Sequence, residues 1–495
     1  MKINPPPLSK KRKTSFKKRR LLKQDNFSLD KNSKKWWGVN PFIFRAYDIR
    51  GIVDQDLNPE IAELIGKAFG TYLIERGTKE VLVGRDVRAS SPEYKKAFIQ
   101  GLLSTGCNVI DIGITLSPIL YFSRQHYKID GGAMVTASHN PREWNGFKLC
   151  HGTTTIKAEE IQKVGDIVLA AKFKTGKGKI RKLDPFPDYL REIEKRIELK
   201  KQLRVIVDCG NAAPALFVPK FLEKLGYKVI SISPNIDSSF PRGLLDPVKL
   251  DHYQELTKKV KEEKADVGLL FDGDGDRVGF VDKEGNIWLG DMILILLIRE
   301  ILPKNPGRKV IVEVKDSELV FEETKRLGGI PIFWKTGHTS ISHKVFEEKA
   351  ILGGEMSCHY WITDDWYYFD DPMYTTARIL KIISESGKSL SQLMGEIPIY
   401  PATPEYRLEC PEDKKFKTVE ELVKYFRDKC DKVIDVDGIR GYIKDGWFLI
   451  RASNTQPLIS LRCEAKTKEG LEKIKKFVKD KLDQYPYLHL DWSKQ

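Results

Sequence analysis

Residues 79–106, KEVLVGRDVRASSPEYKKAFIQGLLSTG, contain the pattern that decides the fold. The run rich in Val and Leu up to Asp86 predicts a buried strand, and the apolar periodicity from Ser91 onward predicts an amphipathic helix. The same order recurs at residues 203–226 and 309–329. Such alternation predicts α/β units with parallel or mixed sheets, in which ligands gather at the carboxyl ends of the strands.

Chain length predicts several such units. At about 100 to 200 residues per domain, a chain of 495 residues makes about three or four domains. The C-terminal region differs, because a hairpin-like pattern at 433–453 and a helix from Glu469 predict a smaller α+β domain. Stretches rich in Pro or Gly indicate the joints. The predicted division is a basic disordered tail at 1–38, α/β domains at 39–184, 185–288 and 289–400, and an α+β domain at 401–495.

Positive charge is concentrated at the N-terminus. Residues 1–38 contain 13 Lys or Arg against 2 Asp, a net +11, so the formal charge of +15 leaves +4 for the rest of the chain. The run Lys10–Arg20 has the charge to bind nucleic acid or an anionic membrane face. A like-charged run with Phe16 as its single aromatic residue is more typical of a solvated, disordered segment, and a targeting role also stays open.

The rest of the composition indicates a cytoplasmic protein without a membrane span. The longest uncharged apolar run, Met292–Ile298, is far shorter than the roughly 20 residues of a spanning helix. The N-terminus lacks the apolar core of a secretory signal. The cysteines are odd in number and scattered, with no C-x-x-C pair for zinc, which favours a reducing compartment. They are Cys107, Cys150, Cys209, Cys358, Cys410, Cys430 and Cys463.

The heptapeptide FDGDGDR, which ends an apolar run, is the clearest metal-binding pattern. Asp272, Asp274 and Asp276 alternate with glycines that let the backbone curl, so all three carboxylates can face one hard cation. An EF-hand begins in this way, but Arg277 stands where that loop needs Gly and Lys283 where it needs Glu. An aspartate trio with few other fixed ligands leaves coordination positions open, as Mg²⁺ sites do. We therefore favour a Mg²⁺ site over the alternative of a solvated acidic turn.

The stretch VTASHNPREWNGFK at 135–148 places Ser138 beside His139. It lacks the G-x-S-x-G elbow of a Ser-His-Asp hydrolase, and adjacent residues seldom act as nucleophile and base. Ser138 could instead be phosphorylated, which would add negative charge and acceptor oxygens to a metal shell. An Asx or ST turn ahead of Pro141 explains the same residues equally well.

Two later stretches have the donors that a sugar phosphate needs. RASNTQP, from Arg451 to Pro457, combines a guanidinium with Ser, Asn and Thr, and indicates either an anion cradle or a polar turn. GGEMSCHYW at 353–361 alternates Glu355 and Ser357 on one face, an arrangement that suits sugar hydroxyls. The histidines of TASHNP, WKTGHTS and GEMSCH are three of only 8 in the chain, and this clustering favours a site over the core.

Taken together, FRAYDIRG, TASHNP, DGDGDR, GEMSCH and RASNTQP resemble the motifs of the α-D-phosphohexomutase superfamily, and most closely its phosphomannomutase/phosphoglucomutase group. The resemblance runs from about Phe44 into the C-terminal domain. It implies three related α/β domains and a fourth α+β domain around a central cleft.

The resemblance also implies roles for individual residues. The implied catalytic residues are Ser138, as a phosphoserine, with Arg50, Lys148 and His359 as acid/base or charge-stabilising groups. The implied Mg²⁺ ligands are Ser138, Asp272, Asp274 and Asp276. The implied substrate-binding residues are Tyr47, His139, Arg277, Lys335, His338, Glu355, Ser357, Arg451, Ser453, Asn454 and Thr455.

The implied reaction interconverts hexose 1-phosphate and hexose 6-phosphate through a phosphoserine and a hexose 1,6-bisphosphate, in a monomer that acts on small sugar phosphates. Phosphoglucosamine mutase is a close alternative, against which Met356 argues because Gln is expected there. An anionic-polymer-binding protein that acts through the basic tail is an alternative of another class. The chain departs from the family at Cys358, where Gly is usual, at Gln456 and at residues 211–215, and Cys358 bears on the choice of hexose, which the sequence leaves open.

Overall fold

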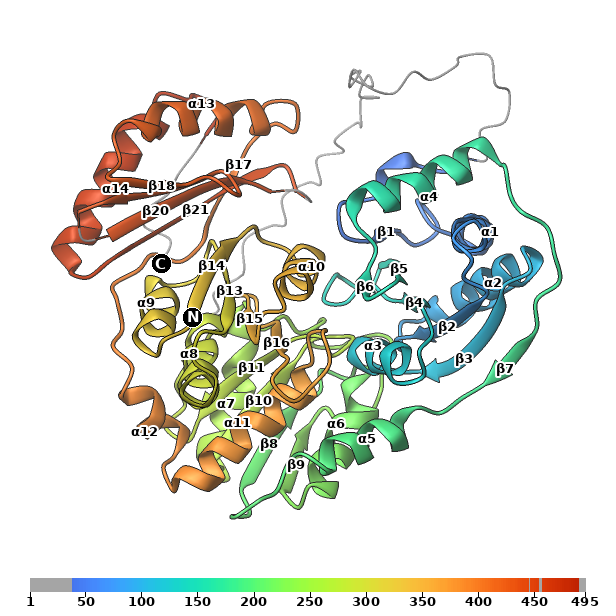
Figure 1. The fold of residues 1–495 in the computed structure, drawn as a ribbon, viewed down its shortest axis with the longest axis horizontal. Coiled ribbons are helices and arrows are strands. Elements are labelled where there is room, and N and C mark those ends of the chain that lie inside the picture. Colours follow the sequence, from blue (N-terminus) through green and yellow to red (C-terminus); the bar gives the residue numbers. More distant parts are fainter. Residues whose placement is uncertain (1–37, 445, 454–455, 489–495) are drawn as a thin grey trace, which may run out of the picture. The chain divides into compact units, whose positions relative to one another are not determined.

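Strand β2 (Glu80–Arg85) and helix α2 (Ser91–Ser104) form where the sequence predicts them. The computed structural model describes residues 38–444, 446–453 and 456–488, so the predicted basic tail lies outside the described residues except for Gly38 (Figure 1). The described elements lie in the unit Val39–Gln495. Among the described residues, no helix combines the length and the apolar character needed to cross a membrane.

The first sheet has the strand order β1-β5-β4-β2-β3-β7, with β6 paired to β5. Strands β4, β2, β3 and β7 run parallel, whereas β5 runs antiparallel to β1, β4 and β6. The other elements of this region are η1 (Pro41–Ile43), β1 (Ile49–Ile52), α1 (Pro59–Ile74), β3 (Asn108–Ile114), α3 (Ser117–His126), β4 (Gly131–Val135), β5 (Trp144–His151), β6 (Thr154–Thr155), α4 (Ala158–Ala170) and β7 (Ile180–Lys182).

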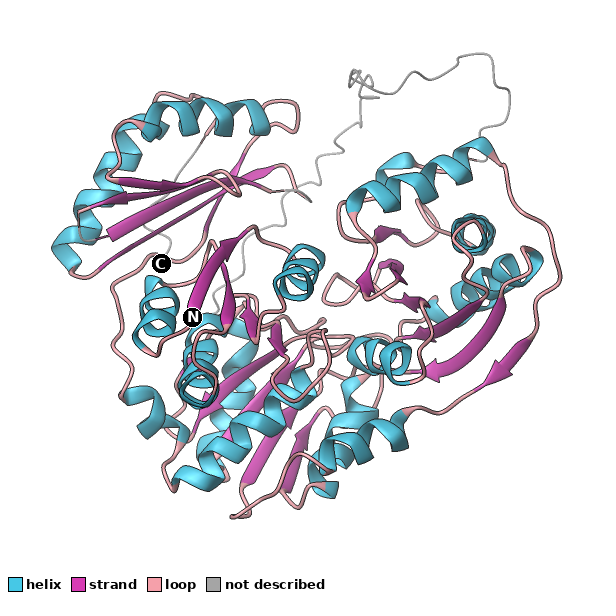
Figure 2. Ribbon diagram, viewed as in Figure 1, coloured by secondary structure: helices cyan, strands magenta, loops and turns pink. Residues whose placement is uncertain are grey.

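Alternation along β2 explains why helices cover both faces of this sheet (Figure 2). Val81 and Val83 point into an apolar cluster that contains side chains of α1, α2 and α4. Leu82, between them, points to the opposite face and joins a second cluster with side chains of α3. A strand that is apolar on both faces is typical of a sheet buried between helices.

The second and third sheets follow in the chain. Their strand orders are β12-β11-β10-β8-β9 and β14-β13-β15-β16. The second region comprises α5 (Phe186–Glu194), β8 (Arg204–Asp208), α6 (Pro214–Lys224), β9 (Lys228–Ile232), η2 (Leu250–Tyr253), α7 (Gln254–Glu262), β10 (Val267–Phe271), β11 (Val278–Asp282) and β12 (Ile287–Trp288). The third region comprises α8 (Gly290–Ile301), η3 (Leu302–Lys304), β13 (Lys309–Glu313), α9 (Glu318–Arg326), β14 (Ile330–Trp334), α10 (His338–Glu348), β15 (Leu352–Gly354), β16 (Tyr360–Ile362), α11 (Pro372–Ser386) and α12 (Leu390–Gly395).

The three sheets share one topological core. The orders β3-β2-β4-β5, β9-β8-β10-β11 and β14-β13-β15-β16 are equivalent, with three parallel strands followed by one antiparallel strand. This equivalence agrees with the strand-then-helix pattern that recurs in the sequence at residues 79, 203 and 309. One continuous apolar cluster includes Leu82, Val205 and Val312 from these three sheets.

The fourth sheet is entirely antiparallel, with the order β17-β21-β20-β19-β18. Helices α13 and α14 pack against its central strands (Figure 1). The predicted α+β organisation of the C-terminal region is therefore confirmed. Its elements are β17 (Tyr406–Glu409), α13 (Lys415–Arg427), β18 (Lys432–Ile434), β19 (Ile439–Ile443), β20 (Gly446–Ala452), β21 (Leu458–Ala465) and α14 (Lys468–Leu482).

Candidate active site

Equivalent loops of the first three sheets carry the predicted site residues. Ser138 lies in the loop from β4 to β5, Asp272 in the loop from β10 to β11, and Glu355 in the loop from β15 to β16. Each loop starts at the carboxyl end of a parallel strand, where ligand sites of α/β sheets form. The topology therefore repeats one loop position three times.

The loop that carries Ser138 is held by buried polar contacts. Ser138 has a φ of 49°, in the left-handed region that non-glycine residues rarely adopt. Its amide donates to Oγ1 of Thr136 at 2.9 Å, and its carbonyl accepts from Arg88 at 2.8 Å. The contact with Oγ1 of Thr136 is an ST turn, formed by the side chain of Thr136. Oγ of Ser138 is left to donate to Asp272 at 2.5 Å.

His139, next in the chain, also reaches the serine. Its Nδ1 lies 3.0 Å from Oγ of Ser138, so these adjacent residues do make contact. Burial first, and then the positive charges of Arg277 and Arg50, hold the pKa of His139 well below its usual value. His139 is therefore neutral near pH 7.

The aspartate loop brings its three carboxylates together in a buried position. Oxygen atoms of Asp272, Asp274 and Asp276 lie within 4.8 Å of one another. Gly275 has a φ of 72°, and a Cβ at Gly273 would lie 2.5 Å from the carbonyl oxygen of Ser138. The two glycines of DGDGD thus permit the turn and the close approach of the serine loop.

The donor set of this loop fits a hard divalent cation. Within the described part of the chain, buried Oδ1 atoms of Asp274 and Asp276 have no hydrogen-bond partner. Burial, followed by the charges of Asp276 and Asp274, raises the pKa of Asp272 well above its usual value. Carboxylate oxygens that are buried, close together and unsatisfied are the ligands that Mg²⁺ takes in proteins.

One basic residue of the first sheet contacts this cluster, and another contacts the serine loop. Nζ of Lys148, on β5, lies 2.6 Å from Oδ2 of Asp274 and also pairs with Asp276. Burial lowers the pKa of Lys148, but Asp274 and Asp276 outweigh it and raise that pKa well above its usual value. Arg50, on β1, donates to Oδ1 of Asn140 at 2.7 Å and so contacts the serine loop.

The loop from β15 to β16 supplies the predicted sugar-binding residues. Oε1 of Glu355 accepts from the amide of Gly337 at 2.7 Å, and the Ser357 hydroxyl lies 3.4 Å from Oε2 of Glu355. Cys358 has a φ of 70°, a conformation that explains why Gly is usual at this position.

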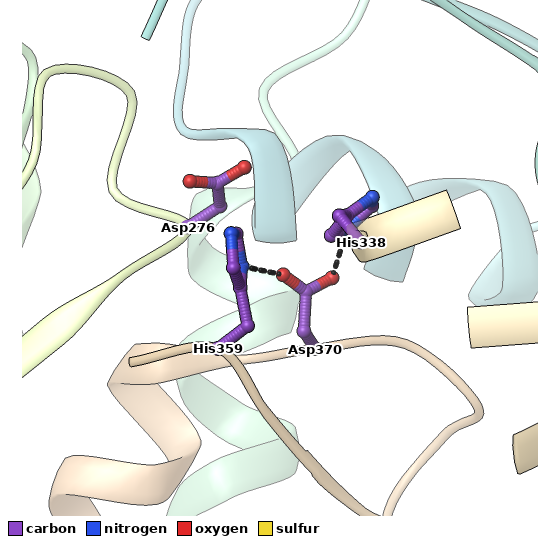
Figure 3. A group of neighbouring side chains, drawn as sticks. All are labelled: Asp276, His338, His359 and Asp370. Atoms are coloured by element: carbon purple, nitrogen blue, oxygen red, sulfur yellow. Dashed lines mark hydrogen bonds and ion pairs between the residues drawn. The ribbon is translucent and has the colours of Figure 1, made fainter. Parts of the chain in front are cut away.

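His359, in this loop, and His338, the first residue of α10, share one carboxylate (Figure 3). Nε2 of His338 is 2.7 Å from Oδ1 of Asp370, and Nδ1 of His359 is 2.8 Å from Oδ2 of the same aspartate. Nε of Arg277 donates to Nε2 of His359 at 2.9 Å. Burial lowers the pKa of His338, but Asp370 outweighs burial and raises it above its usual value.

The fourth sheet contributes Arg451 at the end of β20. Arg451 is buried and its Nε donates to Oδ2 of Asp437 at 2.8 Å. The same Asp437 oxygen accepts from the amide of Thr336 at 3.1 Å, and the hydroxyl of Tyr47 donates to the carbonyl of Thr336 at 3.1 Å. These contacts bring residues of the first, third and fourth sheets together. Among the phosphate-cradle residues, Ser453 accepts from the amide of Gln456 at 3.1 Å, whereas Asn454 and Thr455 lie outside the described residues.

Sequence reasoning missed several residues of this region. Lys335 is exposed, whereas Lys315 is buried, with Nζ 3.3 Å from Oε1 of Glu313 at the end of β13. Asp370, which contacts His338 and His359, and Arg88, which donates to the carbonyl of Ser138, were missed as well. Lys315 follows a predicted strand, and Arg88 follows the predicted strand in the stretch 79–106, so strand ends supply a usable signal for both. Asp370 had no such signal.

Comparison with known protein families identifies this chain as a four-domain α/β protein. Models of the phosphoglucomutase/phosphomannomutase α/β/α domains I, II and III match residues 41–175, 186–285 and 289–400, and the model of the C-terminal domain of the same proteins matches residues 405–481. The chain therefore belongs to the phosphoglucomutase/phosphomannomutase family, within the α-D-phosphohexomutase superfamily.

Individual relatives agree over most of the chain. A phosphomannomutase/phosphoglucomutase of Pseudomonas aeruginosa is 39% identical over 440 residues, which cover 89% of this chain and 95% of the relative. A phosphoglucomutase of Neisseria gonorrhoeae is 36% identical over 454 residues, which cover 91% and 98%. The crystal structure of a phosphoglucomutase/phosphomannomutase family protein from Burkholderia thailandensis superposes with a TM-score of 0.85 at 35% identity and covers 90% of this chain and 98% of that one.

Proposed function

We propose that this chain is a phosphohexomutase that interconverts hexose 1-phosphate and hexose 6-phosphate, with mannose, glucose or both as the hexose. The observation that carries the proposal is the contact between Oγ of Ser138 and the buried carboxylate of Asp272 at 2.5 Å. It places a hydroxyl at the edge of an aspartate trio that fits a divalent cation. The names of the relatives, phosphomannomutase and phosphoglucomutase, support the substrate class.

In the proposed reaction, a phosphoryl group on Ser138 passes to the free hydroxyl of the bound sugar phosphate. The bond from Oγ to phosphorus breaks as the bond from phosphorus to the sugar oxygen forms. The sugar hydroxyl gives its proton to His359, and Lys148 gives a proton to the departing Oγ of Ser138. The product is a hexose 1,6-bisphosphate, which turns end for end in the site. The same steps in reverse then return the other phosphoryl group to Ser138, and free bisphosphate acts as an activator because it can phosphorylate this serine.

The chain supplies positioning and charge for this transfer. Asp272, Asp274 and Asp276, with an oxygen on Ser138, would hold Mg²⁺, which neutralises charge on the transferring phosphoryl oxygens. Lys148 places its ammonium 2.6 Å from Asp274 and adds positive charge at the same point. Most of the rate in phosphoryl transfer comes from such positioning and charge stabilisation.

The remaining residues bind the parts of the substrate that do not react. Arg451 and the cradle after β20 bind the second phosphate, because a guanidinium forms a bidentate contact with it. Glu355 and Ser357 bind ring hydroxyls. In this proposal, further contacts come from Tyr47, His139, Arg277, Lys335, His338, Ser453, Asn454 and Thr455, and charge stabilisation comes from Arg50.

The decisive experiment compares Ser138→Ala with wild type on mannose 1-phosphate and glucose 1-phosphate, with Mg²⁺ and a hexose 1,6-bisphosphate, followed by ³¹P NMR. The variant should lose turnover. Ser123→Ala is the matched control, since Ser123 is a buried serine that donates to the Ile119 carbonyl within α3. Turnover by Ser138→Ala within about tenfold of wild type would refute the role of the serine, since loss of a nucleophile costs far more.

A third substrate, glucosamine 1-phosphate, tests the close alternative, because faster turnover of this substrate would favour a phosphoglucosamine mutase.

We further propose a cytoplasmic monomer. All the proposed site residues belong to one chain, and all seven cysteines are free thiols, which fits a reducing compartment. The basic tail does not enter this proposal.

A further inference from the structure

A buried hydrogen-bonded chain links His338, Asp370, His359 and Arg277 (Figure 3). Asp370 follows β16 and is fully buried, and His359 is 2% exposed. A carboxylate oxygen of Asp276 and ring nitrogens of both histidines lie within 4.8 Å of one another and of Asp370. The chain therefore adjoins the aspartate trio.

The donors in this chain fix the tautomer of His359. A guanidinium always carries its protons, so Nε of Arg277 is a donor and Nε2 of His359 must accept from it at 2.9 Å. The ring proton then resides on Nδ1, which donates to Oδ2 of Asp370 at 2.8 Å. An ionised carboxylate accepts only, so Asp370 selects the tautomer of His359 that is protonated at Nδ1.

The same four side chains have the composition of a metal site, with two imidazoles and two carboxylates. Their contacts argue against that use. Both ring nitrogens of His359 are engaged, and Arg277 and Lys148 already supply positive charge beside Asp276. A hydrogen-bonded relay accounts for the arrangement better than a second cation.

Aromatic rings hold the two imidazoles in place. The centroid of Trp361 lies 5.8 Å from that of His338 and 6.0 Å from that of His359. Tyr121, from α3, stacks on His338 at 5.9 Å. Packing thus limits rotation of the rings. Asp370 fixes which nitrogens donate to it, Nε2 of His338 and Nδ1 of His359.

We propose that Asp370 is a positioning residue for phosphoryl transfer, which directs the lone pair of His359 Nε2 toward the reacting hydroxyl and stabilises the imidazolium that forms. The substrate hydroxyl takes the place of Arg277 at Nε2. As the hydroxyl oxygen bonds to phosphorus and the Ser138 oxygen leaves, the hydroxyl proton moves to Nε2 of His359. Nδ1 of His359 keeps its hydrogen bond to Asp370. The inference rests on the proposed function for its kinetic part alone.

Asp370→Asn tests this role because it preserves shape and removes the second acceptor. If the amide nitrogen faces His359, Nδ1 must accept, the proton moves to Nε2 and the contact with Arg277 is lost. If it faces His338, that imidazole must be neutral at Nε2. We expect kcat to fall by about 100-fold, the lower end of what a general base contributes, with KM changed by less than about threefold.

The second readout is independent of turnover. Nitrogen-15 NMR of the full-length protein, labelled in histidine, reports which ring nitrogen is protonated. In wild type, His359 should be protonated at Nδ1 and bare at Nε2, and Asp370→Asn should change this pattern at His359 or His338. His126 and His151, at the end of α3 and on β5, serve as internal reporters of folding.

Asp371→Asn is the matched control. Asp371 is the neighbouring buried carboxylate, which accepts from Tyr189, Trp366 and the amide of Tyr374 and caps the N-terminus of α11. It should lower Tm while leaving kcat within about threefold and the His359 pattern unchanged. The proposal is wrong if Asp370→Asn keeps kcat within about threefold, or if kcat falls while both histidine patterns stay as in wild type. Absence of wild-type mutase activity alongside the predicted NMR pattern would instead refute the proposed function.

Discussion

Replacing Arg88 by lysine is expected to loosen the loop that carries Ser138 and to slow turnover. Arg88 is buried after β2, and its guanidinium donates to three backbone carbonyls of that loop and to one at the start of β5. The distances are 2.8 Å to Ser138, 2.7 Å to Asn140, 2.8 Å to Pro141 and 2.8 Å to Trp144. The rigid fork of arginine therefore ties the ends and the centre of the loop to one point.

The magnitude follows from counting acceptors. The four carbonyls and Asp86, which pairs with Nε at 3.1 Å, make five acceptors for one side chain. Lysine has three donors and therefore loses at least two of these five contacts, although Oδ2 of Asp86 still accepts from Thr136 and the Pro141 carbonyl still accepts from the amide of Trp144. At about 1 to 2 kcal/mol for each lost hydrogen bond to a charged donor, opening of the loop becomes easier by about 2 to 4 kcal/mol. That difference corresponds to about 30-fold to 1,000-fold faster amide exchange, at about 1.4 kcal/mol per tenfold change.

Hydrogen–deuterium exchange measures this opening directly. The amides of Ser138, Asn140 and Trp144 are hydrogen-bonded within the loop and should lose protection, while kcat/KM falls by about 100-fold because the serine is misplaced. Arg124→Lys is the matched control, since Arg124 is a buried arginine of α3 that donates to other backbone carbonyls. Protection of the serine loop within about threefold of wild type, or an equal loss in the control, would refute the reasoning.

Three further outcomes follow from buried groups. Chelation of divalent metal should lower Tm, and Mg²⁺ at about 100 times its Kd should restore about 2.7 kcal/mol in a thermal-shift titration, a response that Asp274→Asn should largely remove. Cys358→Gly should be more stable to urea than Cys358→Ala by about 1 kcal/mol, because only glycine tolerates the φ of 70° without strain, and equal midpoints would contradict this. Burial raises the pKa of Glu405, but Lys315 and a hydrogen bond from Ser460 outweigh burial and lower this pKa to about 2. The stabilisation that Glu405 contributes is therefore present above its ordinary pKa of 4.5 and is lost as the pH falls from 4.5 to 2. Glu405→Gln should accordingly cost up to about 3 kcal/mol at pH 7, and its difference from wild type should shrink in acid unfolding below pH 4.5.

Local patterns account for what the sequence could predict. The strand and helix at residues 79–106 follow from apolar periodicity alone, and the aspartate trio follows from alternation with glycine within seven residues. The contact of Ser138 with Asp272 is different, because the two residues are 134 positions apart in the chain. It was expected from the family resemblance and from the general rule that sites form at the carboxyl ends of strands.

Tertiary contacts account for what the sequence could not predict. Asp370 stands in the stretch YFDDP with no periodicity or motif that points to a site, and its partners His338 and His359 meet it only in the folded chain. Its neighbour Asp371 has the same residue type and burial but begins a helix instead. Composition cannot separate two such carboxylates, whereas their hydrogen-bond partners do.

The repeated loop position explains how distant residues reach the precision that catalysis needs. In each of the three mixed sheets, the site loop joins a parallel strand to an antiparallel neighbour, so ladder hydrogen bonds hold both of its ends. Groups held on such rigid elements keep their geometry better than groups on free loops. The same clamping makes register decisive: Met134 pairs with Lys148 across β4 and β5. A one-residue slip of β5 would turn Lys148 to the opposite face of the sheet, away from Asp274, because side chains alternate along a strand.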